Sequence, residues 1–205
     1  MFYYFILFLS LFFSFFLSSE IKTIESLLGD SDYFSGSFLQ RTLHLDKVMT
    51  AKGKIFANRK GKFKLVYEEP LNELIISDGI NLHRYDRDLE QVQIQSLEEL
   101  PKGIPINFLS FTPEKLNQYF SISSCKTVRD KTNCKLYSKE EESYIKEIEM
   151  STTGNLLQFL RYEDVLGQTV TFQFTNTSNK QIDDNLFSFS YPLGVDIIHY
   201  QSYQQ

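Results

Sequence analysis

Short runs of alternating apolar and polar residues dominate the chain from residue 33 onward. In 169-TVTFQFT-175, for example, Val170, Phe172 and Phe174 alternate with Thr and Gln. Successive side chains of a strand point to opposite faces, so this period is typical of a half-buried strand. Such runs lie at 33–42, 53–59, 63–70, 73–79, 80–86, 89–97, 135–139, 143–151, 155–165, 168–176 and 187–192. They predict an antiparallel sheet of about eleven strands, with turns at the intervening Gly, Asn and Asp.

Two segments break this alternation. Residues 20–28 carry an apolar stripe at helical spacing that stops at Gly29, which predicts an N-terminal helix. Residues 96–120 contain three prolines and two short helical patterns, at 104–110 and 113–120. Strands interrupted by helices, without a βαβ rhythm, predict the α+β class.

A sheet of this size can form a sandwich, close into a filled barrel, or curl around a cavity capped by the helices. The chain has 19 Phe, 12 Tyr and no Trp. Rigid aromatic side chains at alternate positions suit either a plain core or the wall of an apolar pocket. Periodicity alone favours the plain core and leaves the cavity open.

The N-terminus reads as a targeting segment. Residues 2–17 are apolar or aromatic apart from two serines, and Ser18 and Ser19 supply small residues for cleavage. We therefore expect a signal peptide at 1–19 and an exported mature protein with a single domain at 20–205. The alternative is an uncleaved anchor, although the run is short for a bilayer span. The absence of Cys near this junction disfavours lipid anchoring.

Cys125 and Cys134 are the only cysteines, separated by polar residues that are typical of a turn. We expect them to face each other across a hairpin and to form a disulfide in an oxidising compartment. The alternative is a pair of buried thiols. No His or further Cys lies nearby to complete a metal site.

Catalytic patterns are not apparent in the sequence. His44, His83 and His199 are widely spaced, and none of the common nucleophile, zinc-hydrolase or nucleotide-binding motifs occurs. His83, close to Asp86, could be a base held by a carboxylate, but a histidine that fills an aromatic wall is the favoured interpretation. The net charge of −5, without a basic patch, argues against nucleic acid. We expect no enzyme activity, no cofactor and no metal.

Several segments also resemble a known family when taken in order. They are 34-FSGSFLQ-40, 63-FKLVYEEP-70, 76-ISDG-79, 85-YDRDLEQV-92, 164-DVLGQTVTFQF-174 and 187-FSFSYPLGVDII-198. Together they are similar to the outer-membrane lipoprotein carrier protein family, LolA. Each segment is weakly specific alone, but the set spans most of residues 20–199 in the correct order.

The resemblance implies an incomplete, unclosed β-barrel with a helical lid over an apolar cavity. It also implies a monomeric periplasmic carrier of acylated lipoproteins. Its partners would be an inner-membrane ABC transporter that releases lipoproteins and, as a further candidate, an outer-membrane acceptor. The alternative is a lipid-binding envelope-stress sensor or regulatory module of the same fold.

The resemblance also implies positions for the site. The cavity wall would comprise Phe34, Phe38, Phe63, Leu65, Tyr67, Leu82, Tyr85, Val92, Ile94, Phe172 and Phe174. The lid would come from 20–28 and 104–120, with Ile104, Ile106, Phe108 and Leu109 as its apolar face. Arg59 would lock the empty lid by donating hydrogen bonds to lid carbonyls. The sequence departs from the family pattern at Lys60, Leu65 and His83, which replace Pro, Trp and Trp.

Overall fold

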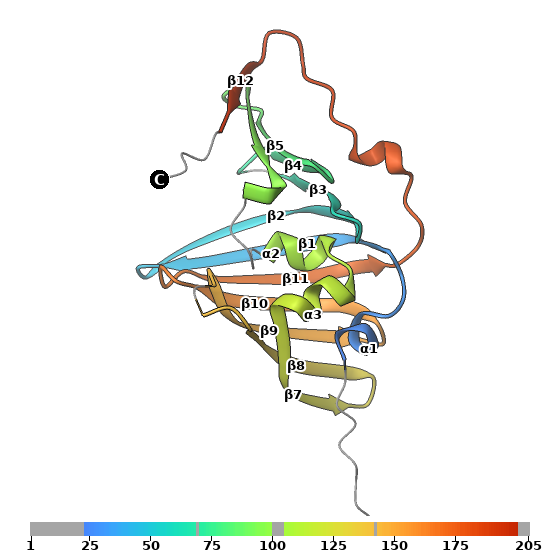
Figure 1. Cartoon of the computed structure of the whole chain (residues 1–205). Coiled ribbons are helices and arrows are strands. Elements are labelled where there is room, and N and C mark those ends of the chain that lie inside the picture. Colours follow the sequence, from blue (N-terminus) through green and yellow to red (C-terminus); the bar gives the residue numbers. More distant parts are fainter. Residues whose placement is uncertain (1–22, 69, 100–104, 142, 201–205) are drawn as a thin grey trace, which may run out of the picture.

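One long sheet organises the chain in the computed structural model (Figure 1), which describes residues 23–68, 70–99, 105–141 and 143–200. The strands are β1 (Tyr33–His44), β2 (Lys47–Asn58), β3 (Lys62–Tyr67), β4 (Glu73–Asp78), β5 (Asn81–Asp86), β6 (Gln91–Ser96), β7 (Phe120–Val128), β8 (Lys131–Ser138), β9 (Ile145–Thr153), β10 (Leu156–Asp164), β11 (Thr169–Ser178) and β12 (Asp196–His199). The helices are α1 (Ile24–Leu28), α2 (Pro105–Ser110), α3 (Pro113–Tyr119) and two 3₁₀ turns, η1 (Leu97–Glu99) and η2 (Asp184–Phe187).

The sheet is open and almost entirely antiparallel. Its strand order is β12-β6-β5-β4-β3-β2-β1-β11-β10-β9-β8-β7, with β12 parallel to β6. The two end strands, β12 and β7, do not pair with each other among the described residues. The pairing of β1 with β11 joins the two halves of the sheet. The predicted α+β class and unclosed barrel are confirmed, with twelve strands in place of about eleven.

One predicted strand, 187–192, is wrong. Phe187 ends η2, and residues 188–192 form no strand. The alternation there has another cause, because Phe189 and Tyr191 both place their rings against His83 on the sheet. The twelfth strand follows instead at Asp196–His199 and pairs with β6.

The predicted hairpin and disulfide are confirmed. Cys125 on β7 lies directly opposite Cys134 on β8, with their Cα atoms 4.2 Å apart, and the two are bonded. Closing this short loop restricts the unfolded chain and stabilises the fold by about 2–3 kcal/mol.

The three helices lie over one face of the sheet, here called the concave face (Figure 1). Local sequence sets their ends. Thr23 and Thr112 accept hydrogen bonds from the first turns of α1 and α3, and Pro113 opens α3 where no amide hydrogen is needed. Gly29 ends α1 with a φ of 68°, which favours glycine. Leu27, Phe108 and Leu116 are buried against the strands, so these contacts form the main core.

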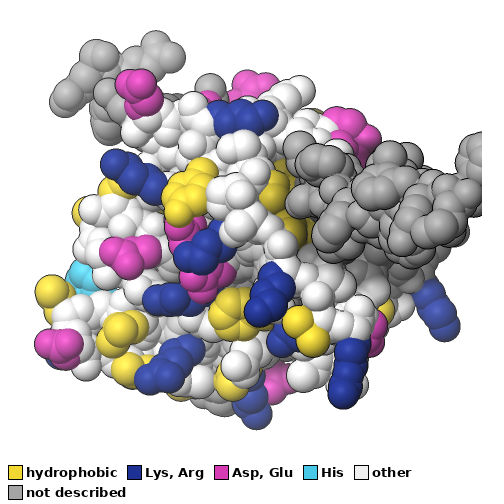
Figure 2. All heavy atoms as spheres, turned by 90° about the horizontal axis from the view of Figure 1, so that it is seen from below, with side chains coloured by type: hydrophobic (Ala, Val, Ile, Leu, Met, Phe, Trp, Pro, Cys, Tyr) yellow, Lys and Arg dark blue, Asp and Glu magenta, His cyan; other side chains and the backbone are white. Residues whose placement is uncertain are grey.

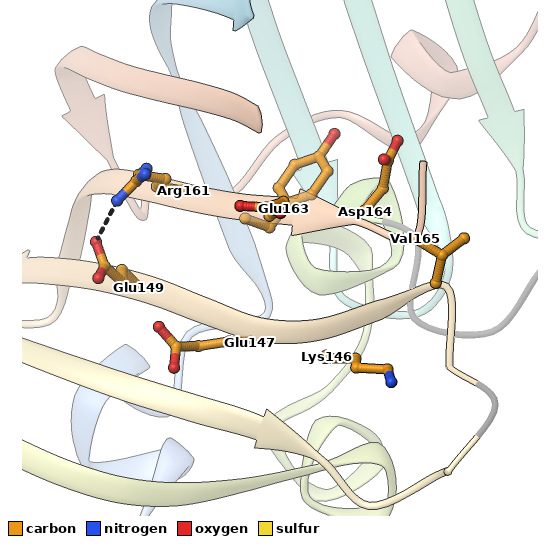
Figure 3. A pocket seen from close by; sticks show the side chains of 8 residues that line it. Lys146, Glu147, Glu149, Arg161, Glu163, Asp164 and Val165 are labelled. Carbon is orange, nitrogen blue, oxygen red and sulfur yellow. Dashed lines mark hydrogen bonds and ion pairs between the residues drawn. The ribbon is translucent and has the colours of Figure 1, made fainter. Parts of the chain in front are cut away.

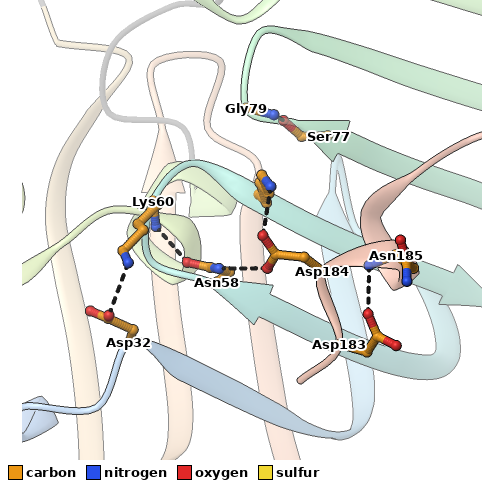
Figure 4. A network of polar contacts seen from close by, with 9 residues as sticks. Asp32, Asn58, Lys60, Ser77, Gly79, Asp183, Asp184 and Asn185 are labelled. Atoms are coloured by element: carbon orange, nitrogen blue, oxygen red, sulfur yellow. Dashed lines mark hydrogen bonds and ion pairs between the residues drawn. The ribbon is translucent and has the colours of Figure 1, made fainter. Parts of the chain in front are cut away.

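A smaller core lies on the opposite, outer face of β3–β6. The C-terminal segment 184–192 covers it, and buries Phe187 together with Leu74, Ile76 and Val92. Polar contacts anchor the start of this segment (Figure 4): Asp184 accepts hydrogen bonds from Lys62 Nζ at 2.9 Å and from Asn58 Nδ2 at 3.2 Å. Lys62 holds the pKa of the Asp184 carboxyl below its usual range.

Close packing between the neighbouring strands β1, β2 and β3 requires a glycine at position 53. Gly53 lies opposite Phe38 on β1 and Tyr67 on β3. A Cβ there would lie 2.2 Å from the Val66 carbonyl oxygen and 2.8 Å from the Phe38 ring, so backbone would have to move. We expect Gly53→Ala to lower the free energy of unfolding by about 2 kcal/mol in urea denaturation.

Lys52→Ala is the control for this variant, because Lys52 is the exposed neighbour on the outer face. It should change the free energy of unfolding by no more than about 0.5 kcal/mol. Equal stability of Gly53→Ala and the unmodified protein would show that β3 shifts without cost.

Candidate functional site

Aromatic side chains occupy the centre of the concave face. Phe38 packs edge-on against Tyr67, with ring centroids 5.1 Å apart, and against Phe172 at 5.7 Å. Phe174 stacks on Phe172 at 5.8 Å and meets Phe34 edge-on at 5.5 Å. Four strands, β1, β2, β3 and β11, therefore present one continuous apolar surface beneath the helices.

Strand register decides which predicted wall residues share this surface. Residues directly opposite in an antiparallel pair lie on the same face. Phe63 therefore shares its face with Ser77 and Leu82, and Leu65 shares its face with Ile75 and Arg84. The structure places on the concave face Phe34, Phe38, Phe63, Leu65, Tyr67, Leu82, Phe172 and Phe174.

Tyr85, Val92 and Ile94 were placed on the same wall, and that prediction is wrong. Tyr85 pairs with Leu74 and Val92, and Ile94 pairs with His83, all on the outer face. Leu82 and Tyr85 are three positions apart in a regular strand, so the two cannot face the same way. These residues contribute to the outer face that the C-terminal segment covers.

His83 also lies on the outer face. It is 8% exposed, its Nδ1 is 3.1 Å from Tyr191 Oη, and its ring lies against Phe189. Its Nε2 is 3.7 Å from Asp78 Oδ2. His83 has the aromatic neighbours that were expected, but they belong to the smaller core on the outer face. Through these contacts, His83 attaches the C-terminal segment to β5.

The structure places two of the four residues predicted for the apolar face of the lid. Phe108 and Leu109 on α2 are 2% and 6% exposed and pack into the main core. Ile104 lies outside the described residues, as does the side chain of Ile106. Sequence reasoning did not single out Leu116, which is fully buried on α3. Its position in the 113–120 helical pattern was the signal that could have found it.

Polar contacts also hold these helices in place. Gly61 N–H donates to the Ser110 carbonyl at 3.0 Å, which ties the end of α2 to the β2–β3 turn. Asn117 Nδ2 on α3 donates to Glu25 Oε1 on α1. Lys139 donates to two carbonyls at the end of α3, through its backbone N–H to Tyr119 at 2.8 Å and through Nζ to Asn117. Both polar and apolar contacts therefore attach the helices.

Arg59 occupies the β2–β3 turn, and its side chain makes no hydrogen bond to the described residues of α2 or α3. It is 6% exposed, and its buried Nε and Nη1 find no acceptor among the described residues. Its backbone N–H donates to the Asp32 carbonyl at 2.7 Å. Burial lowers the pKa of the guanidinium to about 10, partly offset by the charge of Asp32. Within the described part of the chain, this buried cation forms no ion pair, and Asp32 is the charge that partly offsets its burial.

Polar pairs limit the apolar surface at one end of the concave face. Tyr67 Oη donates to Gln40 Oε1 at 2.7 Å, and burial and the charge of Glu73 raise the pKa of Tyr67. Arg84 donates two hydrogen bonds to Glu73, at 2.8 and 3.1 Å. Because these groups satisfy one another, they close this end without leaving charge unpaired.

Charged side chains dominate one surface pocket. A pocket of about 440 Å³ on β9 and β10 is lined mainly by charged side chains, with Arg161 paired to Glu149 at 3.4 Å (Figure 3). The face in Figure 2 shows Lys and Arg interspersed with Asp and Glu. Within the described ranges, no group of three or more potential ligands could hold a metal, and no helix is long and apolar enough to cross a membrane.

Comparison with known proteins identifies the fold's relatives. Residues 30–190 match the family described as outer membrane lipoprotein carrier protein LolA. This chain belongs to that family. The family name agrees with the resemblance found in the sequence, and the match covers β1–β11, α2 and α3.

Individual relatives give the same result. The chain is 28% identical to an outer-membrane lipoprotein carrier protein of Chromohalobacter salexigens, covering 86% of this chain and 85% of that protein. It is also 28% identical to one of Pseudomonas putida, covering 87% of each. A solved LolA superfamily protein of Nitrosomonas europaea, 12% identical, superimposes with a TM-score of 0.50, covering 84% of this chain and 97% of that one. At such low identity the last comparison supports the fold alone.

Arg59 generates a stability prediction for this LolA-family protein. A base whose pKa is lowered by folding is less favourable in its charged form in the folded state, so its charge lowers stability at neutral pH. We expect Arg59→Met to raise the free energy of unfolding of the lipid-free protein by roughly 2 kcal/mol. Urea denaturation at pH 7 measures this.

Arg161→Met supplies the control, because Arg161 is exposed on the outer face. It should alter stability by about 0.5 kcal/mol or less. If Arg59→Met is less stable than the unmodified protein, the guanidinium makes a favourable contact that compensates for its burial.

Proposed function

We propose that this protein is a periplasmic carrier that binds the acyl chains of lipoproteins released from the inner membrane and delivers them to the outer membrane. The observation that carries the proposal is the concave aromatic face, which is covered by short helices rather than by a second sheet. Membership of the carrier family supports lipoproteins as the cargo. The proposed partners are acylated lipoproteins, a releasing ABC transporter and an outer-membrane acceptor, with the carrier acting as a monomer.

The physical requirement matches this arrangement. Each buried CH₂ group contributes about 0.8 kcal/mol, so a lipoprotein with several long chains does not leave a membrane unaided. Phe108, Leu109 and Leu116 now cover the apolar face. Acyl chains that replaced these side chains would exchange one set of apolar contacts for another. The net affinity would then be moderate, which a carrier that must also release its cargo requires.

Transport of this kind forms and breaks no covalent bond in the carrier. We therefore propose a non-enzymatic role without a cofactor. Residues 1–19 would act as a cleaved signal peptide that places the remaining chain, 20–205, in the periplasm. The N-terminal segment lies outside the described residues.

Depletion of the protein in its host tests the transport role. We expect outer-membrane lipoproteins to accumulate at the inner membrane, because their acyl chains have no aqueous carrier. Membrane fractionation followed by detection of individual lipoproteins measures the distribution. Normal sorting after complete depletion would contradict the proposal.

A tryptophan reporter tests whether lipid displaces the lid. The chain has no Trp, so Phe108→Trp would give the only indole signal, from the underside of α2. We expect a saturable emission shift when a dipalmitoylated lipopeptide is added, because the indole leaves its packed position. Phe159→Trp is the matched control, since Phe159 lies on the outer face opposite Gln173.

The control protein should show no shift over the same lipopeptide range. Equal responses of the two variants would indicate non-specific association. Lipopeptide binding without any change at position 108 would show that the chains enter elsewhere.

A further inference from the structure

The β1–β2 hairpin projects past β3 at one end of the sheet (Figure 1). β3 pairs with residues Gly53–Asn58 of β2, so residues 47–51 have no strand partner on that side among the described residues. On the other side, Thr169 pairs with Leu43, which places the β10–β11 turn, residues 165–168, beside the hairpin. Two neighbouring turns therefore form this tip of the sheet.

Apolar side chains are exposed at this tip. Leu45 is 80% exposed and Leu166 is 71% exposed, and Leu43, Val48 and Val165 are also exposed. Leu43 lies directly opposite Val48 in the hairpin. Single exposed apolar side chains need no explanation, but a contiguous group of them indicates an interaction surface.

Leu45 occupies a position where the fold gains little from a leucine. Leu45 and Asp46 form the two-residue turn of the hairpin, with φ of 46° and 62°. Positive φ at both turn positions favours Asn, Asp or Gly, and a bulky side chain there adds strain. Because Leu45 is largely exposed, packing within the chain does not compensate for this strain. A contact outside the chain explains the leucine better.

Positive charge lies behind the apolar tip. The chain has 26 Asp and Glu against 21 Lys and Arg, yet β1, β2 and β11 contain four Lys or Arg and no Asp or Glu. The four are Arg41, Lys47, Lys52 and Lys54. Lys52 pairs with Glu68 at 3.3 Å, whereas the other three form no ion pair with the described residues.

Two carboxylates lie near these cations without cancelling them. Asp46, in the turn, is the one carboxylate between residues 33 and 58. Glu163 belongs to β10, which is separated from β1 by the uncharged strand β11. The hairpin is therefore a positive region on an acidic protein, which favours a negatively charged partner.

The spacing of the apolar and basic groups fits a lipid surface. Residues advance by about 3.4 Å along an antiparallel strand, so Arg41 lies roughly 7 Å behind Leu43 and roughly 14 Å behind Leu45. Elements that lie at a membrane surface bury apolar groups about 5–10 Å into the boundary of headgroups and acyl chains. Basic residues just behind them are attracted to anionic headgroups. An acidic protein would pair with the cations but would leave the apolar tip exposed.

We propose that the tip of the β1–β2 hairpin docks on an anionic phospholipid bilayer. Leu43, Leu45 and Val48 enter the headgroup region together with the β10–β11 turn, and Arg41 and Lys47 meet the lipid phosphates. This contact goes beyond the proposed carrier function, because it holds the protein at a membrane whether or not cargo is bound.

Vesicle flotation of the purified protein tests the surface. The vesicles contain either equal parts of phosphatidylglycerol and phosphatidylcholine or phosphatidylcholine alone. We expect flotation with the anionic vesicles. Binding should weaken about tenfold in the double variant Arg41→Gln, Lys47→Gln and about fivefold in Leu45→Asn. Because Asn is favoured in this turn, the second variant removes the apolar contact without destabilising the hairpin.

Ile80→Asn and the double variant Arg129→Gln, Lys131→Gln are the matched controls. Ile80, in the β4–β5 turn, is 71% exposed. Arg129 and Lys131, at the β7–β8 turn, are also exposed. Both turns lie at the opposite end of the sheet from the β1–β2 turn, because the strands between them are antiparallel. Both controls should bind vesicles like the unmodified protein.

Three results would contradict the proposal. The first is no flotation of the unmodified protein, and the second is unchanged flotation of both tip variants. The third is equal flotation with both kinds of vesicle, which would overturn the anionic bilayer. Retention on immobilised polyglutamate that depends on Arg41 and Lys47, without flotation, would assign the surface to an acidic protein instead.

A combined variant separates this proposal from the carrier function. Leu45→Asn in the Phe108→Trp background should lose vesicle binding but keep the emission shift with lipopeptide. Loss of the lipopeptide response with vesicle binding intact in Phe108→Trp would count against the carrier function alone.

Discussion

Apolar contact between three short helices and the concave face is the interaction on which the rest of the structure depends. The helices α1, α2 and α3 have 5, 6 and 7 residues. Helices this short are not stable alone in water, so they exist because Leu27, Phe108 and Leu116 bury their side chains against the sheet. The lid is therefore ordered by the surface that it hides. A ligand that occupied this surface would replace the apolar contacts that hold the helices in place.

The outer face has a cover of a different kind. There the C-terminal segment is held by directional contacts as well as by apolar ones: Asp184 bonds to Lys62 and Asn58, and Tyr191 meets His83. Breaking that cover means separating several polar partners at once. The two faces of the sheet thus carry different kinds of cover, short helices on the concave face and a largely extended segment on the outer face.

Local patterns predicted most of the strands, because the alternation and the turn residues lie within the sequence of each segment. They predicted the disulfide for the same reason, since both cysteines belong to one hairpin. The face of Tyr85, Val92 and Ile94 could not be obtained this way: a strand with apolar residues on both sides shows only that both sides are covered. What covers each side depends on residues about a hundred positions away, such as Phe189 and Tyr191. That Nε and Nη1 of Arg59 lack an acceptor among the described residues likewise depends on neighbours that no local pattern specifies.

The pairing of β1 with β11 has a consequence for the order in which the protein can form. Ser35 pairs with Ser178, and β12, near the end of the chain, pairs with β6, which lies near the middle of the chain. A chain that emerges with its N-terminus first, from a ribosome or a translocation channel, has no partner for one edge of β1 until β11 arrives. Contacts so distant in sequence slow folding. The same topology that makes a wide concave sheet thus delays its completion until β11 has emerged and joined its two halves.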